Sequence, residues 1–318
     1  MLALTMTDEG PRIEEDRPRP RRGPREATVR LLAGGICATD LEITAGYAAF
    51  RGVMGHEWVG IVEEADDTAW TGRRVVGDIN VACGTCASCT ADRPNHCASR
   101  QVLGIRGRDG AFAERFTVPV RNLHRVPEGV CDDQAVFVEP LAAALRILEQ
   151  VRITPADTAI VLGVGRLGQL CCRVLQLAGA RVFAVGRTRR RMGWLPPGVV
   201  GTTDVASLPR ADVVVDCTGS PDGLALAARC VRPCGTVVLK TTTHGAVTLD
   251  TATWVVDEIT VVGSRCGPFA PALHMLEEGT LDLRPLITGR FALRDGVAAL
   301  EAAAGADHLK VLLTPDGS

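Results

Sequence analysis

The 318-residue sequence predicts an α/β protein with two domains, one rich in β-strands and one built on a doubly wound parallel sheet. Three observations lead to this prediction. Short strand-like segments and turns fill most of the chain before residue 130. From Thr158 onward, apolar strand-like runs alternate with helical patterns. A glycine turn, Gly163–Gly168, separates the first of these runs from the first helical pattern.

The composition excludes several classes of protein. Hydrophobic residues make up 46% of the chain and charged residues 23%, as in a soluble enzyme with a full core. The net charge of −2 gives no reason to expect a nucleic-acid or membrane partner. No apolar run reaches the ~18 residues of a membrane span, and the N-terminus lacks the charged-then-apolar order of a signal peptide. We therefore expect a cytoplasmic protein.

The first basic segment of the chain, Asp16–Glu26, reads DRPRPRRGPRE. Pro and Gly interleaved with Arg predict an exposed, extended linker. The competing interpretation is a nucleic-acid contact, but no aromatic residue accompanies these charges. We therefore assign the segment no binding role.

Candidate metal ligands follow this linker. Cys37 comes after a predicted strand at Ala27–Leu32, and the adjacent pair His56 and Glu57 precedes another at Val59–Glu63. Thiolate, imidazole and carboxylate are the three ligand types that zinc prefers. Because the three residues are separated in sequence, only the fold could bring them together into one site.

Twelve cysteines divide into Cys37, a cluster of four and a scattered set of seven. In the segment CGTCASCTADRPNHC, three cysteines are spaced C-x2-C-x2-C and a fourth follows eight residues later. Such a loop can close a four-thiolate zinc site, which has no open position and is therefore structural. Iron–sulfur binding is the competing interpretation, but no Pro follows the last Cys and no second cluster motif occurs. The predicted ligands are Cys83, Cys86, Cys89 and Cys97.

The glycine turn predicts a dinucleotide-binding site. Gly163 permits the tight turn, Gly165 lets the backbone approach a pyrophosphate, and Gly168 lets the helix pack close to the strand. The N-terminus of the helix then offers N–H groups to the phosphates. We assign the two residues inside the turn, Arg166 and Leu167, to the same cofactor site.

The end of the second strand of this domain predicts a preference for NADP(H) over NAD(H). NAD sites of this type place Asp or Glu there, roughly 20 residues past the glycine turn, to hold the ribose 2′-hydroxyl. Here the position is Gly186, and no acidic residue occurs between residues 159 and 203. Arg187, Arg189 or Arg190 can bind a 2′-phosphate through charge-assisted hydrogen bonds. The alternative is an ordinary solvated basic turn.

Strand–helix alternation extends the sheet to the end of the domain. After the first strand at Thr158, the predicted strands are Arg181–Val185, Asp212–Asp216, Gly235–Leu239 and Ile259–Val262. Between the second and third strands, Pro196, Pro197 and Gly198 predict a reduced or missing helix. Other predicted elements are a helix from Val138 to about Val151, helices at Pro271–Gly279 and Asp295–Ala304, and a last strand at Leu309–Leu313.

Taken together, these motifs resemble the zinc-dependent medium-chain alcohol dehydrogenases over nearly the whole chain. The resemblance rests on Cys37-x-x-Asp40, Gly55-His56-Glu57, the four-cysteine loop, Glu139-Pro-Leu-Ala, the glycine turn, Asp216-Cys-Thr-Gly219, Cys234–Leu239, Val262-Gly-Ser-Arg265, Leu286-Ile-Thr288 and Leu309-Lys310-Val311. Glu-Pro-Leu-Ala is most similar to the polyol and threonine dehydrogenase branch. The resemblance implies a GroES-like β-rich catalytic domain (residues 1–143 and 266–318), a Rossmann domain (residues 144–265) and an active site in the cleft between them.

The same resemblance implies a catalytic zinc site. Cys37 and His56 match two of its ligands, and Asp40 matches the group that orients the histidine. Glu57 matches the adjacent carboxylate, which binds the metal in the polyol branch. Glu139 matches a carboxylate that binds it directly or through water. Which of the two carboxylates completes the site stays open.

Further roles are implied for residues around the metal and the cofactor. Thr39 matches the hydroxyl that passes the substrate proton, and Lys310 matches a basic residue that contacts the cofactor pyrophosphate. Thr218, in the Asp-Cys-Thr-Gly segment, is assigned to the cofactor site. Glu42 stands where many members carry a relay histidine, so the exit route of the proton stays open.

These features predict a zinc-dependent oxidoreductase that transfers hydride between NADP(H) and an alcohol or polyol, or its carbonyl. We expect two zinc ions per chain and a homodimer or homotetramer that pairs through the strand Ile259–Val262. One alternative is a zinc-bearing reductase of an activated C=C bond or an imine in a biosynthetic pathway. Another is a non-catalytic, NADPH-binding redox sensor, although a sensor has no need of the predicted catalytic ligands.

Overall fold

A computed structural model describes residues 1–242 and 247–315, and the chain divides into two compact units. Unit 1 comprises Met1–Glu139 and Phe269–Ser318, and unit 2 comprises Pro140–Pro268. The domain limits given by the resemblance differ from these by a few residues and stay a prediction. Within the described ranges, no helix has both the length and the apolar character needed to cross a membrane.

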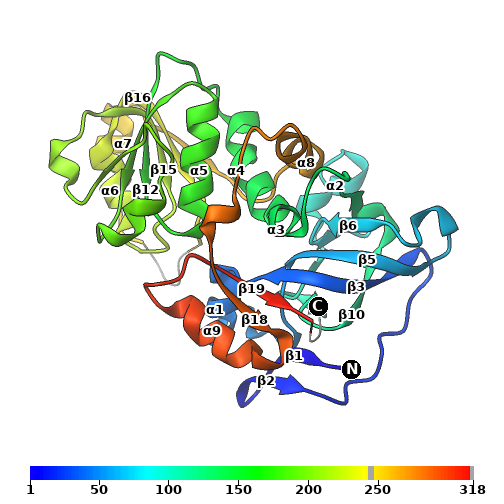
Figure 1. Ribbon diagram of the computed structural model, residues 1–318. Helices are drawn as coiled ribbons and strands as arrows, with labels where there is room; N and C mark the ends of the chain where they lie inside the picture. The colour runs from blue at the N-terminus through cyan, green and yellow to red at the C-terminus, as the bar shows by residue number, and fades with distance from the viewer. Residues whose placement is uncertain (243–246, 316–318) are drawn as a thin grey trace. The chain divides into compact units, whose positions relative to one another are not determined.

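Unit 1 is built around a β-sheet in which both ends of the chain take part. Its strands run in the order β11-β6-β5-β3-β19-β18, and β10 pairs with β3 as well. The bounds are β3 (Glu26–Gly35), β5 (Glu57–Ala65), β6 (Arg74–Gly77), β10 (Arg115–Pro119), β11 (Leu123–Arg125), β18 (Ile287–Ala292) and β19 (Lys310–Thr314). Because β19 pairs with β3, in antiparallel orientation, the C-terminal segment is part of the same sheet (Figure 1).

Smaller elements complete unit 1. The strands β1 (Ala3–Thr7), β2 (Gly10–Glu14) and β4 (Gly52–Val53) form one small sheet, and β7 (Asn80–Val81), β8 (Gln101–Leu103) and β9 (Gly107–Arg108) form another. The helices are α1 (Ala38–Thr44), α2 (Ala87–Thr90), α3 (Asp132–Ala135), α8 (Phe269–Glu277) and α9 (Gly296–Ala304). The basic linker after β2 contains no helix or strand before Glu26, and Arg17 pairs with Asp109 at 2.7 Å.

Unit 2 contains a six-stranded parallel sheet with the order β14-β13-β12-β15-β16-β17. The bounds are β12 (Thr158–Leu162), β13 (Arg181–Val185), β14 (Val200–Thr202), β15 (Ala211–Asp216), β16 (Val231–Leu239) and β17 (Thr260–Gly263). Five of these strands confirm the prediction. The sixth, β14, was not predicted, because it is short and follows two prolines and a glycine. The expected loss of the helix before β15 is confirmed, since only short 3₁₀ turns occur there, at Arg190–Trp194 and Val205–Ser207.

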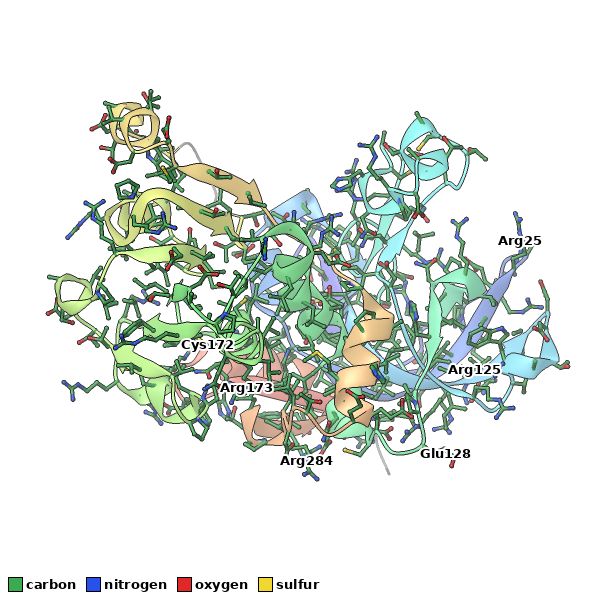
Figure 2. All side chains as sticks on the ribbon, turned by 90° about the horizontal axis from the view of Figure 1, so that it is seen from above. Arg25, Arg125, Glu128, Cys172, Arg173 and Arg284 are labelled. Atoms are coloured by element: carbon green, nitrogen blue, oxygen red, sulfur yellow. The ribbon has the colours of Figure 1, made fainter. Side chains whose placement is uncertain are left out.

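The helices of unit 2 cover both faces of the sheet. The helix α4 (Val138–Gln150) leads into the unit, and α5 (Arg166–Leu177) and α6 (Gly223–Cys230) lie on opposite faces of the sheet (Figure 1). Right-handed crossovers explain this, because the chain moves outward along the sheet in opposite directions after β12 and after β15. A short helix, α7 (Thr251–Val256), precedes β17. Figure 2 marks Cys172 and Arg173, two consecutive buried residues of α5.

Candidate active site and metal centres

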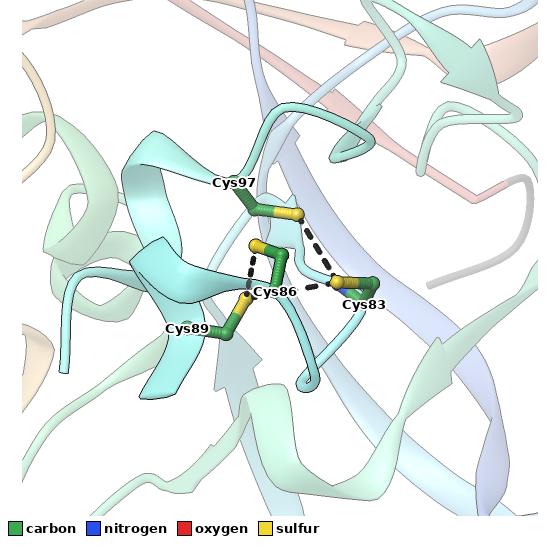
Figure 3. Close-up of side chains that lie close together, drawn as sticks. All are labelled: Cys83, Cys86, Cys89 and Cys97. Carbon is green, nitrogen blue, oxygen red and sulfur yellow. Dashed lines mark hydrogen bonds between the residues drawn. The ribbon is translucent and has the colours of Figure 1, made fainter. Parts of the chain in front are cut away.

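The four clustered cysteines converge on one point in unit 1 (Figure 3). Their sulfurs all lie within 4.8 Å of one another. The Sγ–Sγ distances are 3.5 Å for Cys86–Cys89, 3.6 Å for Cys97–Cys83 and 3.9 Å for Cys83–Cys89. A tetrahedral zinc with Zn–S bonds of about 2.3 Å requires sulfurs roughly 3.8 Å apart. The four residues therefore fit a structural zinc ion.

Backbone N–H groups of the loop point at these sulfurs. The amide of Thr85 donates to Cys83 Sγ at 3.5 Å, and the amide of Cys83 donates to Cys97 Sγ at 3.4 Å. The hydrogen bond from Thr85 is the main reason that the pKa of Cys83 falls to about 5. Loss of solvation raises the pKa of Cys89 to about 11, so zinc binding must displace its proton.

A second donor set in unit 1 comprises Cys37, His56 and Glu57. One ligand atom from each lies within 4.8 Å of the others. His56 and Glu57 are buried and Cys37 is half-buried. The sheet brings them together, because Glu57 opens β5 directly opposite Gly35 at the end of β3, and Cys37 follows two residues later. A half-buried thiol with a buried imidazole and a buried carboxylate in one cluster fits the donor chemistry of a catalytic zinc with an open position.

Asp40 contacts both Cys37 and His56. One carboxylate oxygen, Oδ2, accepts the backbone N–H of Cys37 at 2.8 Å, which caps α1. The other, Oδ1, lies 3.3 Å from Nδ1 of His56, and this leaves Nε2 for a metal. Burial alone would lower the pKa of His56, but the charge of Asp40 and the contact with Cys37 raise it well above its usual value.

Glu57 has a partner that the sequence did not indicate. The Nζ of Lys310, on β19, forms an ion pair with Glu57 Oε2, and both side chains are almost completely buried. Gly35 leaves room for this carboxylate, since a Cβ at Gly35 would lie 2.8 Å from Oε2. No sequence pattern could have found a pair that is separated by 253 residues. The pyrophosphate contact that the resemblance implies for Lys310 stays a prediction.

Glu139 and Thr39 lie beside this donor set. Burial raises the pKa of Glu139 to about 7; the charge of Glu57 adds to the rise, and the charges of His56 and Lys310 oppose it. Glu139 is not one of the three residues whose donor atoms meet within 4.8 Å. The hydroxyl of Thr39 lies 3.8 Å from Cys37 Sγ.

The glycine turn in unit 2 packs so closely against other backbone that two of its three glycines have no room for a side chain. Gly163 has φ +94°, and a Cβ there would lie 2.6 Å from the carbonyl oxygen of Cys217. A Cβ at Gly168 would lie 1.8 Å from the carbonyl oxygen of Gly163. Gly165 is the N-cap of α5, whose first two residues are Arg166 and Leu167. The turn therefore allows only glycine at its first and third glycine positions.

The sheet edge next to this turn carries the other predicted cofactor residues. Gly186 directly follows β13, and Arg187 and Arg189 are exposed beyond it. Thr218 follows β15, and its hydroxyl donates to Asp216 Oδ1 at 2.7 Å. Their contacts with a cofactor stay predictions.

Three arginines gather beside the turn. Burial, together with the positive charges of Arg166 and Arg187, lowers the pKa of Arg191. One guanidinium nitrogen of Arg191, Nη1, lies 3.8 Å from the place where a Cβ of Gly165 would stand. Arg191 belongs to the same basic run as Arg187, Arg189 and Arg190 but was not among the predicted phosphate-binding residues.

Side chains on one face of α5 donate hydrogen bonds to backbone carbonyls of the segment from Arg191 to Pro197. Gln169 Nε2 donates to the carbonyl of Arg191 at 2.9 Å, and Gln176 Nε2 donates to that of Pro197 at 2.6 Å. Between them, Arg173 donates from Nη2 to the carbonyl of Trp194 at 2.8 Å and from Nη1 to Gln169 Oε1 at 3.1 Å. The helical spacing of the three side chains puts them on one face, so α5 fixes the segment that carries the arginines.

Comparisons with known proteins agree with this architecture. Residues 23–128 match the family model of the alcohol dehydrogenase GroES-like domain. The chain is 33% identical to L-threonine 3-dehydrogenase of Streptomyces avermitilis over 94% of each chain. Its structure is similar to an alcohol dehydrogenase of Escherichia coli CFT073 complexed with NADH (TM-score 0.90, 25% identity, 99% of both chains). A zinc-binding dehydrogenase of Sinorhizobium meliloti 1021 bound to NADP is similar too (TM-score 0.89, 28% identity, 99% of both chains).

Proposed function

Because the chain belongs to the zinc-dependent medium-chain alcohol dehydrogenase family, on its polyol and threonine dehydrogenase branch, we propose that it oxidises an alcohol or polyol with NADP+, or reduces the carbonyl with NADPH. The chain is an NAD(P)-dependent zinc alcohol or polyol dehydrogenase. The observation that carries this function is the donor set of a half-buried Cys37 with buried His56 and Glu57. The choice of NADP(H) rests on the arginines of unit 2.

The residues of unit 1 have distinct tasks in this reaction. When bound, zinc would act as a Lewis acid toward the oxygen of the alcohol or carbonyl. Cys37 and His56 would hold it, and Asp40 keeps the histidine in position through Nδ1. We assign the acceptance of the substrate hydroxyl proton to Thr39, whose hydroxyl lies 3.8 Å from Cys37 Sγ.

Two carboxylates, Glu57 and Glu139, are candidates for the third protein ligand. Glu57 meets Cys37 and His56 directly, which favours it as the third ligand, and Lys310 balances its charge. Glu139, with a pKa near 7, can hold a proton at neutral pH and would complete the site only after losing it. We therefore assign the metal to Glu57 first and to Glu139 second.

The two alternatives drawn from the sequence predict different experimental results. A reductase of an activated C=C bond or an imine would use the same residues and would act on enones or imines rather than on alcohols. A redox sensor would need only the four-cysteine site. Metal analysis separates the sensor from both enzymes, because two zinc ions per chain support an enzyme and one supports the sensor.

The preference for NADP(H) is supported by charge. Arg166 and Arg187 lie close enough to Arg191 for their charges to help lower its pKa. No acidic residue occurs between residues 159 and 203. A 2′-phosphate would relieve the repulsion between the guanidinium groups and accept their hydrogen bonds. Hydrogen bonds to a charged group contribute about 1.5–3 kcal/mol each, so each arginine could give roughly tenfold discrimination or more.

We expect the wild type to show a higher kcat/KM with NADP+ than with NAD+. Arg187→Ala and Arg191→Ala should each lower this ratio about tenfold, mainly through KM for NADP+. Arg181→Ala, at the opposite end of β13, is the matched control and should leave the ratio unchanged. Gly186→Asp is unsuitable, because a Cβ at Gly186 would lie 2.5 Å from Val164 Cγ2. A wild type that favours NAD+, or arginine variants with an unchanged ratio, would refute the preference.

We also propose that β17 pairs with a second copy of the chain. It is the last strand in the sheet order of unit 2, and Val261 on this strand is exposed. Light scattering should give the mass of a dimer or tetramer, and Val261→Lys should shift it toward the monomer. Val200→Lys, which adds the same charge on β14 at the other edge, is the control. A wild type that is monomeric at micromolar concentration would contradict the proposal.

A further inference from the structure

Cys171 and Cys217, two cysteines outside both zinc sites, lie in contact with each other beside the glycine turn. Cys217 follows β15, and its thiol donates to Cys171 Sγ, on α5, at a sulfur–sulfur distance of 3.8 Å. Cys171 is fully buried, whereas Cys217 is partly exposed. Both residues belong to unit 2, and neither belongs to the candidate metal-binding groups.

The surroundings of the pair favour a thiolate on Cys171. The hydrogen bond from Cys217 is the main reason that the pKa of Cys171 is lowered, and the positive charge of Lys240 acts in the same direction. Lys240 is held by the carbonyls of Ala143 and Arg265 and by the hydroxyl of Ser264. The next residue on α5 is Cys172, which is labelled in Figure 2. It differs from Cys171, because burial raises the pKa of its thiol. Of the two neighbouring helix cysteines, Cys171 is therefore the one with the lowered pKa, and its sulfur is the one that lies next to Cys217.

We propose that Cys171 and Cys217 form an oxidation site at which a peroxide produces an intramolecular disulfide. The Cys171 thiolate attacks one oxygen of hydrogen peroxide, which releases hydroxide and leaves a sulfenic acid on Cys171. The sulfur of Cys217 then attacks this sulfenic sulfur, the S–S bond forms, and the hydroxyl leaves as water with the Cys217 proton. Two thiols and one peroxide thus give one disulfide and two waters, and the two electrons pass from sulfur to the peroxide.

The disulfide would act on the dinucleotide turn. A disulfide bond is about 2.05 Å long, so the sulfurs must approach by roughly 1.8 Å. The carbonyl of Cys217 packs against Gly163 with no room for a Cβ, so a shift of Cys217 is transmitted directly to the turn. The bond would also connect the end of β15 to α5, the helix that begins at this turn. Oxidation should therefore weaken dinucleotide binding, whichever of the two dinucleotides the enzyme prefers.

The test treats the zinc-loaded wild-type enzyme with stoichiometric hydrogen peroxide, blocks the remaining thiols and maps the peptides by mass spectrometry. We expect a disulfide between Cys171 and Cys217, and a Kd for NADPH and for NADH that rises about tenfold or more and returns after a thiol reductant. Zinc content is measured in the same samples, so that oxidation of the metal-site cysteines is detected separately. The variant Cys171→Ser should keep its dinucleotide Kd after peroxide, and Cys172→Ser should respond as the wild type does.

The peptide map decides the proposal even if a variant folds poorly, because it is made on the wild type. Oxidation of the metal-site cysteines without a Cys171–Cys217 disulfide would overturn it. So would a disulfide that leaves both dinucleotide affinities unchanged, or a Cys172→Ser variant that resists peroxide as well as Cys171→Ser does. These results do not depend on the ratio of kcat/KM for NADP+ and NAD+, which tests the proposed cofactor preference on its own.

Discussion

A Cys37→Ser enzyme is expected to lose at least about three orders of magnitude in kcat, because several kcal/mol of charge stabilisation depend on the metal that Cys37 helps to hold. The dinucleotide Kd should stay near the wild-type value, since the glycine turn and the arginines belong to unit 2. Zinc should fall from two ions to one per chain. Steady-state kinetics, fluorescence titration with NADPH and metal analysis measure these three quantities.

Cys131→Ser is the matched control for this experiment. Cys131 is an exposed thiol of unit 1 and belongs to neither donor set, so its loss should leave kcat and zinc content unchanged. A Cys37→Ser enzyme that keeps the wild-type kcat would show that the catalytic metal does not depend on Cys37. Loss of zinc with full retention of turnover would exclude metal-assisted chemistry at this site.

A Cys86→Ser enzyme is expected to lose stability rather than chemistry. Of the fifteen residues from Cys83 to Cys97, only Cys97 is buried, so this loop has no apolar core of its own. Its order must come from the metal, and loss of one thiolate should cost about 3 kcal/mol or more of unfolding free energy. For a unit of this size, such a loss lowers Tm by roughly 10 °C. Calorimetry and zinc analysis measure the effect.

The kinetics of the same variant separate a structural from a catalytic role. Below its unfolding temperature, the folded Cys86→Ser enzyme should keep a kcat close to the wild type, in contrast to Cys37→Ser. Ser88→Ala, in the same loop, removes a hydroxyl without removing a thiolate and serves as the control. A Cys86→Ser enzyme with the wild-type Tm and assembly but no turnover would refute the structural assignment.

Features that depend on nearby residues could be predicted from the sequence. The four-cysteine loop spans fifteen residues, and the spacing of its thiols already limits the geometry that they can adopt. The glycine turn is equally local, because an apolar strand, a left-handed glycine and a helix follow one another directly. The strands from β12 to β17 were found for the same reason, apart from β14, which is too short to give a pattern.

The catalytic cluster was predicted in part. The residue types and the resemblance indicated Cys37, His56 and Glu57, but only the antiparallel pairing of β3 and β5 places Glu57 opposite Gly35. Asp40 has a local role in the capping box of α1, where it accepts the backbone N–H of Cys37, and the fold adds its contact with His56. The capping contact follows from a local sequence pattern. The contact with His56 requires two segments that are far apart in the sequence.

By itself, the sequence determined the fold class, the four-cysteine ligand set and the position of the dinucleotide turn, because each depends on residue type and short-range spacing. The tertiary structure decided which distant side chains meet. It pairs Lys310 with Glu57, places Arg191 beside Gly165, and brings Cys217 to Cys171. Strand order and helix packing set these contacts, and a sequence in which such residues are tens to hundreds of positions apart carries no periodic signal of their distance.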